Sequence, residues 1–284
     1  MKCLYTSDLH GEIYLYQELL ELAQSSSAEI IAIGGDLLPS FPPTKRYEDM
    51  IPNQKIFIDQ FLLPFFKKVI ETTDVNQFFL VPGNWDLAYP HLFKKPAEGL
   101  IDLDRKIHRL RNGYEIIGYP FVPPTPFRPK DYERMDDSNA PWPPQKNPSY
   151  VRTSLQNDEL TAIDPHLYLR TKETIQEDLN QLPKPLSPKR SIYIMHSPPY
   201  RTRLDLIQGG LSAGSRSIRA FIERDQPLLT LHGHIHESVQ LSGTYFDWIG
   251  DTLSVNPGQL ISNRLHAITF KLEEIKKTLT HTIC

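Results

Sequence analysis

Three histidines lie within five positions near the end of the chain, at His232, His234 and His236, directly after the short apolar run that ends at Leu231. The run predicts a β-strand, and in an extended chain successive side chains point to opposite faces. We therefore expect His234 and His236 on one side, with Ile235 turned into the core. Two neutral imidazoles on one edge are the beginning of a metal site. Because two ligands do not hold a metal, the other ligands must come from distant parts of the chain.

Four other predicted strands also end in side chains that bind metals. These strands span residues 2–7, 29–33, 77–81 and 191–195, and they lead into Asp8 with His10, Asp36, Asn84 and His196. The same alternation predicts Asp8 and His10 on one face. Open α/β sheets place their sites at the carboxyl ends of the strands. The sequence therefore predicts one site where these strand ends meet.

Each of these residues has a simpler interpretation when it is taken alone. Asp8 resembles a helix N-cap beside an incidental histidine, and Asp36 and Asn84 follow glycines, as turn residues commonly do. A lone histidine at a strand end, such as His196, is more often structural than a ligand. Taken jointly these interpretations fail, because unrelated caps and turns would rarely all fall at strand carboxyl ends.

The remaining pattern predicts helices between the strands and more β-structure after them. Helical periodicity marks residues 12–23, 56–70 with a kink at Pro64, 171–182 and 212–224. Asn112-Gly113 lies between apolar runs at 106–110 and 114–119 and predicts a β-hairpin. Proline-rich residues 39–54 predict a loop, and further β-segments are expected at 237–244, 252–255, 266–272 and 277–283.

One long segment has neither helical nor strand periodicity. Residues 120–148 hold nine prolines together with Phe121, Phe127, Tyr132 and Trp142. Such a loop within a compact domain is usually functional or disordered, and its aromatic residues favour an ordered flap near the site. No internal repeat and no clean linker divides the chain. We therefore expect a single domain over residues 1–284, with 120–150 as an insertion loop rich in proline and aromatic residues.

Composition narrows the classes of partner. The chain has 284 residues, 39% of them hydrophobic, and a net charge of −3. This net charge gives no overall electrostatic attraction to nucleic acid or to acidic membranes. Its apolar runs are far shorter than the roughly 20 residues that a membrane span needs. The beginning of the chain does not resemble a signal peptide, and Cys3 and Cys284 suggest no disulfide framework. We therefore expect a cytoplasmic protein.

The motifs and their order resemble those of the calcineurin-like metallophosphoesterases. They read Asp-x-His at 8–10, Gly-Asp at 35–36, Gly-Asn-x-Asp at 83–86, a later His at 196 and Gly-His-x-His at 233–236. The resemblance implies an α/β fold, a four-layer αββα sandwich in which two mixed β-sheets pack together with helices outside. Metallo-β-lactamase-like enzymes fit less well, because they carry Asp-His after their His-x-His, where this chain has Glu237-Ser238.

The resemblance also implies two divalent ions at the carboxyl ends of the central strands. One ion would be held by Asp8, His10 and His236, the other by Asn84, His196 and His234, with Asp36 bridging the two. The mixture of nitrogen and hard oxygen ligands favours Mn²⁺, Fe or Zn²⁺ over Ca²⁺. Two such ions about 3.5–4 Å apart lower the pKa of a shared water. The implied reaction is in-line attack of the bridging hydroxide on phosphorus, with Asp36, Asn84, Asp86 and His196 as the catalytic set.

One position departs from the family's usual Gly-Asn-His-Asp motif, in which the His is thought to protonate the leaving oxygen or orient the phosphate. Trp85 stands there and can transfer no proton. General-acid assistance is typically worth about 10²–10⁴-fold, so we expect modest turnover. The departure favours a substrate whose leaving group needs less acid help, or a proton from solvent or another side chain. Trp85 is either a packed core aromatic or a stacking face for a nucleobase. Asp86 would orient a neighbouring histidine. Arg201 and Arg203 either contact the substrate anion or are simply solvated.

The predicted function is a metal-dependent phosphoesterase, and more specifically a phosphodiesterase acting on a small or nucleotide-like phosphate ester. Two alternatives stay open: a catalytically weakened binding or scaffold protein of the same fold, and a nuclease. The near-neutral charge and the lack of a basic run argue against nucleic acid as the substrate.

Overall fold

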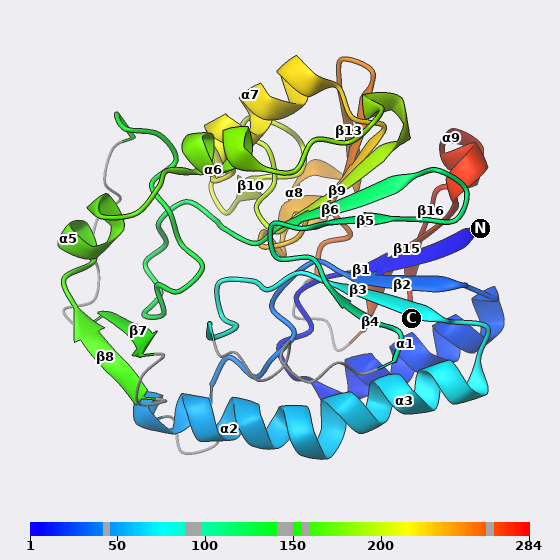
Figure 1. The fold of residues 1–284 in the computed structure, drawn as a ribbon, viewed down its shortest axis with the longest axis horizontal. Helices are drawn as coiled ribbons and strands as arrows, with labels where there is room; N and C mark the ends of the chain where they lie inside the picture. The colour runs from blue at the N-terminus through cyan, green and yellow to red at the C-terminus, as the bar shows by residue number, and fades with distance from the viewer. Residues whose placement is uncertain (42–45, 89–97, 141–149, 155–158, 260–263) are drawn as a thin grey trace.

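The computed structural model describes residues 1–41, 46–88, 98–140, 150–154, 159–259 and 264–284. In these residues two six-stranded mixed β-sheets pack together, with helices on their outer sides (Figure 1). These four layers confirm the predicted αββα sandwich. Within the described ranges, no helix is both long and apolar enough to cross a membrane.

The first sheet has the strand order β16-β15-β1-β2-β3-β4. Its parallel strands are β1 (Lys2–Thr6), β2 (Ile30–Ile33), β3 (Gln77–Leu80) and β4 (Leu100–Asp102), and β15 (His266–Lys271) and β16 (Thr280–Ile283) extend it in antiparallel pairing. Every residue of β2 is buried, as expected of a parallel strand that is covered on both faces. Helices α1 (Ile13–Ser26) and α3 (Leu63–Thr72) cover the outer face (Figure 1).

The second sheet has the strand order β13-β14-β12-β9-β6-β5. Its parallel strands are β6 (Glu115–Tyr119), β9 (Ser191–Met195), β12 (Leu229–Leu231) and β14 (Thr252–Val255), and antiparallel strands β5 (Ile107–Arg109) and β13 (Phe246–Ile249) form the edges. Strands β5 and β6 are the hairpin predicted at Asn112-Gly113. Helices α6 (Ile175–Gln181) and α7 (Arg216–Asp225) cover the outer face (Figure 1).

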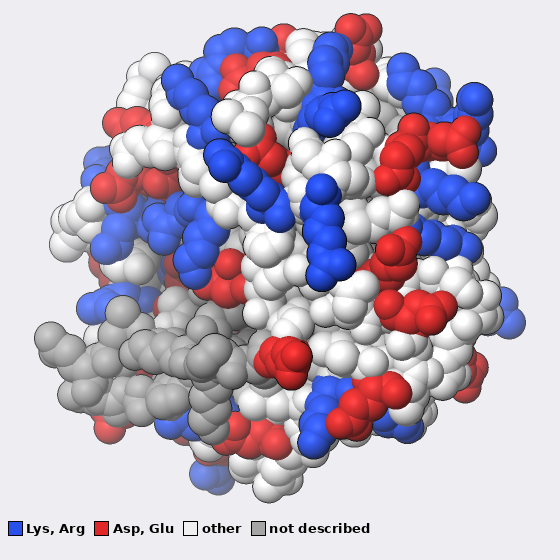
Figure 2. Space-filling view, turned by 45° about the vertical axis from the view of Figure 1, so that its right-hand side comes forward, with Lys and Arg blue, Asp and Glu red and all other residues white. Residues whose placement is uncertain are grey.

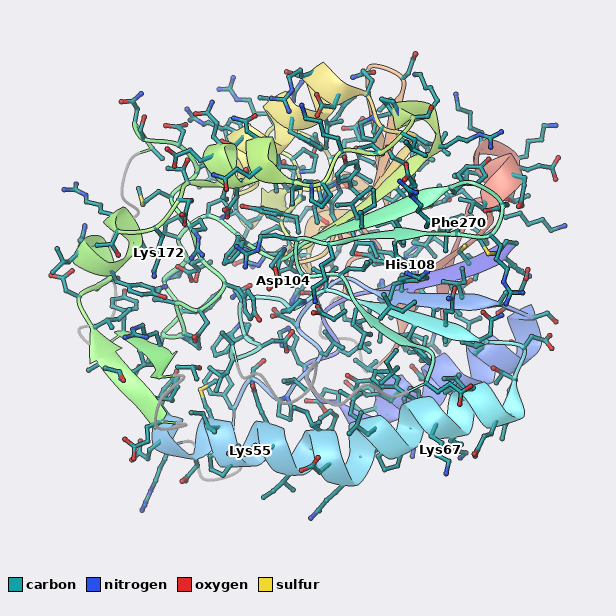
Figure 3. All side chains as sticks on the ribbon, viewed as in Figure 1. Lys55, Lys67, Asp104, His108, Lys172 and Phe270 are labelled. Atoms are coloured by element: carbon teal, nitrogen blue, oxygen red, sulfur yellow. The ribbon has the colours of Figure 1, made fainter. Side chains whose placement is uncertain are left out.

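Apolar side chains from both sheets meet in the middle of the molecule. Phe79 of β3 and Ile194 of β9 belong to this layer, and so does Phe270 of β15, which Figure 3 labels. Burying such side chains between two sheets is the main favourable contribution to folding. The same packing fixes the two sheets relative to one another, and this brings the loops at their carboxyl ends into contact.

The helical stretch after the first loop begins earlier than predicted. It comprises η1 (Tyr47–Asp49), α2 (Met50–Phe57), a π-turn η2 (Ile58–Leu62) and α3, so the prediction of a loop up to residue 54 is wrong from residue 47 onward. Gln54 shows why, since its buried side chain bonds Trp85 and stabilises the helix through tertiary contact. The wide turn directly precedes Pro64, whose missing N–H removes one helical hydrogen bond.

Several other boundaries differ from the predictions. Residues 237–244 are not a strand: they contain helix α8 (Ser238–Ser242), which ends at Gly243 in the left-handed region (φ 72°). Helix α6 begins later than predicted because Thr174 caps it. Helix α7 also begins later than predicted, because Ser215 caps it by accepting the N–H of Ile218. The remaining short elements are β10 (Leu206–Ile207), β11 (Leu211–Ser212), η3 (Pro188–Arg190), η4 (Leu272–Glu274) and α9 (Ile275–Thr278).

The segment after β6 has no helix or strand over residues 120–140, in agreement with its predicted irregularity. Lys130 and Glu133 form an ion pair of 2.9 Å there, and both side chains are fully buried. Lys130 also donates to the carbonyl groups of Thr125 and Phe127, so an internal polar network holds this segment. Residues 141–149, with Trp142, lie outside the described residues. The sequence did not predict the hairpin β7 (Tyr150–Ser154) and β8 (Glu159–Ile163) or helix α5 (Pro165–Arg170).

Candidate metal centre

The loops that follow the central strands of both sheets are hydrogen-bonded to one another. The N–H groups of Asp8 and His10 donate to the carbonyls of Gly35 and Asp36 at 2.9 and 2.8 Å. In the second sheet, the N–H of Gly233 donates to the carbonyl of His196 at 3.0 Å. These backbone bonds bring the predicted strand-end residues to one edge of the sandwich.

Four of the predicted ligands form a tight cluster. Asp8, His10, Asp36 and His236 each offer one ligand atom, and these atoms all lie within 4.8 Å of one another. His236 Nε2 is 3.2 Å from Asp8 Oδ1 and also 3.2 Å from His10 Nε2. Three of these residues are the ligands predicted for the first ion, and Asp36 is the predicted bridge.

The other three predicted ligands lie on the far side of Asp36. His196 Nε2 is 3.5 Å from Asp36 Oδ2 and 3.2 Å from Asn84 Oδ1. The rings of His196 and His234 lie 5.2 Å apart between centroids. The backbone N–H of His234 also donates to both carboxylate oxygens of Asp8, at 3.1 and 3.0 Å. The structure thus brings all seven predicted ligands to one place.

The local backbone differs from what strand alternation predicted. Asp8, His10, Asp36 and His234 all have positive φ angles, of 61°, 47°, 51° and 65°. The prediction that these side chains share a face because they lie in extended strands is therefore wrong, since the strands end before them. Left-handed backbone at non-glycine residues costs about 1–3 kcal/mol and is common at functional sites.

Two glycines leave room for the cluster. A Cβ at Gly83 would lie 2.3 Å from the backbone nitrogen and from Oδ1 of Asp36. A Cβ at Gly233 would lie 1.9 Å from Ser7 Oγ and 2.5 Å from Asp8 Oδ2. Glycine is needed at both positions because another residue's functional side chain or backbone occupies the space.

Neighbouring groups orient the imidazole rings. His196 Nδ1 lies 2.7 Å from the carbonyl oxygen of Gly34, and His10 Nδ1 contacts Ser40 Oγ. Such contacts set which ring nitrogen faces the site. His232 differs from the other two histidines of its motif. Its nitrogens contact the carbonyls of Met195 and Ser197 and the hydroxyl of Thr230, so His232 supports the loop instead of pointing into the cluster.

Burial and charge shift the ionisation of the cluster residues in opposite directions. Burial disfavours the charged form of Asp8 and Asp36, but the histidines outweigh it and hold both pKa values below their usual range. Burial also lowers the pKa of His196, but the charge of Asp36 outweighs it and raises that pKa to about 9. For His234, burial and then the charge of His196 lower the pKa to about 3. Ionised carboxylates and neutral imidazoles are the forms that bind cations, so His196 would release its proton when a cation binds.

Among the residues that the structure describes, Asp86 contacts no histidine, so the prediction that it orients one does not hold there. Its carboxylate accepts the backbone N–H groups of Leu37, Leu38 and Gly83 at 3.2, 2.8 and 2.8 Å. Burial, followed by the charge of Asp36, raises the pKa of Asp86 to about 7. Asp86 therefore joins the loop that carries Asp36 to the loop that carries Asn84.

Trp85 is a packed aromatic residue with only 8% of its surface exposed. Its ring lies 4.9 Å from that of Phe41 and 5.1 Å from that of Phe127, between centroids. Its backbone N–H donates to Asp36 Oδ1 at 2.8 Å. The packing favours the core interpretation over a free stacking face. It also shows that the insertion segment, through Phe127, reaches the residue beside the predicted bridging ligand.

Arg201 and Arg203 follow His196 on the loop after β9, and the side chains of both are exposed. The N–H of Arg201 donates to Asp205, and that of Arg203 donates to Asp247. The guanidinium of Arg201 lies 5.5 Å from the ring centroid of Tyr200. Their contacts in the described residues are therefore with this loop, α7 and β13, and not with the Asp8–Asp36 cluster.

Sequence reasoning missed two residues that shape the site. Ser40 contacts His10, and Asn256 Nδ2 lies 3.2 Å from the carbonyl of Gly233 and 3.3 Å from that of Ile235. In the sequence Asn256 appears only as the start of an Asn-Pro-Gly turn. Its role becomes visible only when the turn after β14 is placed beside the histidine loop.

The residues present fit divalent cations. Carboxylates and imidazoles from distant segments converge, two imidazole nitrogens face each other at 3.2 Å, and the amide oxygen of Asn84 lies 3.2 Å from His196 Nε2. Such a donor set suits first-row transition metals better than Ca²⁺.

Fold and cluster together define a class, the metal-dependent phosphoester hydrolases. The sequence profile of the calcineurin-like phosphoesterases matches residues 1–238, so the chain belongs to this family. A comparison with curated proteins found no significant match. The fold is similar to one crystal structure with a TM-score of 0.61 and 18% identity, which covers 99% of this chain and 98% of that chain. It is also similar to TT1561 of Thermus thermophilus, with a TM-score of 0.56, 18% identity and the same coverage of each chain.

Proposed function

We propose that the chain hydrolyses small or nucleotide-like phosphodiesters with the help of two divalent ions. The observation that carries this proposal is the place of Asp36, whose Oδ2 lies 3.8 Å from His10 Nε2 and 3.5 Å from His196 Nε2. One carboxylate thus lies between both groups of predicted ligands. Asp8, His10 and His236 would hold one ion, Asn84, His196 and His234 the other, and Asp36 would be shared.

The chain's own residues prepare this site. Bound Mn²⁺, Fe or Zn²⁺ would supply an activated water and polarise the phosphoryl oxygens. Asp8 and Asp36 are almost completely buried, and exclusion of water strengthens their attraction for a cation. The contact of His196 Nδ1 with Gly34 keeps Nε2 directed at Asp36. Asp86 acts as a positioning residue, because its hydrogen bonds fix the backbone around Asp36.

The preference for diesters rests on Trp85. The position offers no proton donor, so substrates with an undemanding leaving group are favoured. Arg201 and Arg203 are the proposed contacts for the substrate anion, since they extend from the loop that begins at His196. We further propose that residues 1–284 act as one domain with 120–150 as its insertion. Cys3 and Cys284 are both free, which fits a cytoplasmic location.

The test combines metal analysis with hydrolysis. Protein stripped with a chelator and reloaded with Mn²⁺, Zn²⁺ or Fe²⁺ is expected to bind two ions per chain and to hydrolyse bis-p-nitrophenyl phosphate. Asp36→Ala should reduce the rate by at least about 10³-fold, as expected for a residue that organises the reacting groups. The matched control is Asp251→Ala, because that carboxylate is exposed and pairs only with Lys189 in the described residues.

The outcomes separate the alternatives. Asp36→Ala with full activity would contradict the bridging role. A protein that takes up no metal would support the binding or scaffold alternative instead. A gel assay on single- and double-stranded DNA and RNA tests the nuclease alternative. On the face shown in Figure 2, acidic and basic side chains are interspersed without one broad basic patch, which supports a small substrate.

A further inference from the structure

Three arginines gather around Tyr200 outside the metal centre. Arg201, Arg216 and Arg219 line an open recess of about 580 Å³ together with Tyr200. The guanidinium carbons of Arg201 and Arg216 lie 5.5 and 4.8 Å from the ring centroid of Tyr200, within the range of cation–π attraction. One aromatic ring thus holds two cations close together.

The positive charge of this recess is not balanced locally. Arg219 pairs with Glu223 at 2.8 Å, but within the described part of the chain neither Arg201 nor Arg216 has a carboxylate at ion-pair distance. Nearby carboxylates are engaged elsewhere. Asp205 accepts the N–H groups of Arg201, Thr202 and Gly214. Asp136 accepts the backbone N–H groups of Arg216 and Ser217 at the start of α7. Asp137 accepts the N–H of Asn139.

The backbone beneath the arginines is fixed. Arg201 has a φ of 55°, and Arg219 Nη1 donates to the carbonyls of Tyr200 and Arg201 at 3.0 and 2.8 Å. The N–H of Tyr200 donates to the carbonyl of Ser215 at 2.9 Å. These contacts join the loop after β9 to α7, so two cationic side chains leave a rigid base at fixed positions.

The recess lies within reach of the metal centre. Arg201 follows His196 by five positions, and an extended chain of that length spans at most roughly 18 Å. The backbone of Arg201 therefore lies no farther than this from that of the predicted ligand His196. Planar guanidinium groups match phosphate oxygens in geometry and charge.

We propose that Arg201 and Arg216 bind a second phosphate group of the substrate, one that is not cleaved. The inference rests on the proposed function and narrows its substrate class to esters with two phosphate groups. Tyr200 packs against both guanidinium groups, and Arg219 supports the loop.

The test uses two substrates that differ in one phosphate. Thymidine 5′-(p-nitrophenyl phosphate) carries only the reacting group, and its 3′-phosphorylated form carries a second phosphate. The R201Q/R216Q variant is expected to raise KM for the 3′-phosphorylated substrate about 10–100-fold more than KM for the other substrate, as the loss of charged hydrogen bonds to the second phosphate predicts. The control K67Q/K68Q removes the same charge from α3, where Lys67 points away from the sheets (Figure 3).

A binding measurement separates this inference from the proposed catalysis. Calorimetry of pyrophosphate with protein in chelator should show binding to the parent and to K67Q/K68Q, and about tenfold or greater weakening in R201Q/R216Q. Equal affinity in all three proteins, or no binding to the parent, overturns the phosphate site. Weakened pyrophosphate binding with unchanged KM for both substrates overturns its role as a substrate subsite. Failure of bis-p-nitrophenyl phosphate hydrolysis alone contradicts only the proposed function.

Discussion

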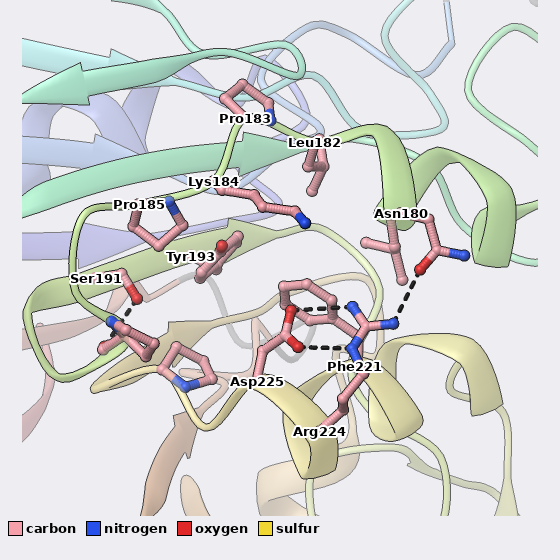
Figure 4. A pocket seen from close by; sticks show the side chains of 13 residues that line it. Asn180, Leu182, Pro183, Lys184, Pro185, Ser191, Tyr193, Phe221, Arg224 and Asp225 are labelled. Carbon is pink, nitrogen blue, oxygen red and sulfur yellow. Dashed lines mark hydrogen bonds and ion pairs between the residues drawn. The ribbon is translucent and has the colours of Figure 1, made fainter.

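At its carboxyl end strand β9 leads into His196, whereas its amino end borders a recess of about 450 Å³ next to α6 and α7. Figure 4 shows this recess, which is lined by apolar Leu182, Tyr193 and Phe221 and by Arg224, whose guanidinium pairs with Asp225 and contacts Asn180. A hollow therefore lies at one end of the strand and a cluster of ligand atoms at the other.

The two ends differ in how their polar groups are satisfied. In the amino-end recess the charged groups of Arg224 and Asp225 neutralise each other. At the carboxyl end, Asn84 Nδ2 lacks a partner among the described residues, and four ligands have left-handed backbone. Strain and unsatisfied polar atoms both reduce stability. Left-handed backbone and an unsatisfied polar atom occur together at the carboxyl end of β9. This indicates that function, and not packing, determined the residues there. The recess at the amino end, taken alone, would have pointed away from the predicted metal ligands.

The largest effect is expected from Gly83→Ala. The added Cβ would lie 2.3 Å from the backbone nitrogen of Asp36, so the loop must shift, and we expect a loss of activity similar to that of Asp36→Ala. Overpacking of this kind typically costs about 1–3 kcal/mol of stability. Gly209→Ala is the control, because its Cβ would meet nothing within 4 Å and its φ of 88° imposes only a backbone cost. Hydrolysis of bis-p-nitrophenyl phosphate measures the loss of activity, and urea unfolding measures the loss of stability. A Gly83→Ala variant with full activity would contradict the expected clash with Asp36.

A second expected effect concerns the pH dependence of stability. Asp131 is buried in the insertion segment, its Oδ2 has no partner among the described residues, and burial raises its pKa to about 6. Between roughly pH 4 and that value the unfolded chain loses this proton while the folded chain keeps it. The wild type should therefore lose stability relative to Asp131→Asn by up to about 3 kcal/mol as the pH rises through this window.

Urea unfolding of both proteins at about pH 4 and about pH 7 measures this difference, because the other titrating groups cancel between them. A difference that stays constant across this range contradicts the raised pKa. That result would also mean that the buried polar groups of the insertion segment are satisfied, as those in the recess at the amino end of β9 are.

A third effect is expected from Trp85→His, which restores the residue type of the common family motif. Removing the packed indole between Phe41 and Phe127 should destabilise the fold by about 2–4 kcal/mol, visible as a lower melting temperature. General-acid help should nevertheless speed hydrolysis of a diester with an alcohol leaving group by about 10²-fold. An unchanged rate and pH profile in the folded variant would show that Trp85 does not set the substrate preference.

The smallest effect is expected at the amino end. Lys184 lines the recess of Figure 4, and Lys184→Gln should change stability by less than about 0.5 kcal/mol, as surface substitutions commonly do. Hydrolysis of bis-p-nitrophenyl phosphate should stay within about twofold of the parent rate. A tenfold change in kcat/KM would show that the two ends of β9 are energetically coupled and do not act independently.

Much of the candidate site is readable in the sequence because its ligands follow recognisable strands. Asp8, Asp36, Asn84, His196 and His234 each come directly after a predicted strand or a glycine. The role of Asp86 was misjudged because a carboxylate that bonds backbone N–H groups looks the same in sequence as one that orients a histidine. The helical residues 47–54 were missed because tertiary contacts of Gln54, and not local propensity, stabilise them.

The sequence by itself determined which residue types stand at the ends of the strands, and hence the family and the kind of chemistry. Only the tertiary structure decided how those residues meet. Left-handed turns, and not strand alternation, aim them at one another, and glycines leave the space they need. The physical reason is that each turn is held by hydrogen bonds to loops far away in the chain, such as those between residues 8–10 and 35–36. Such bonds exist only after strands distant in the sequence, here β1 and β2, have paired.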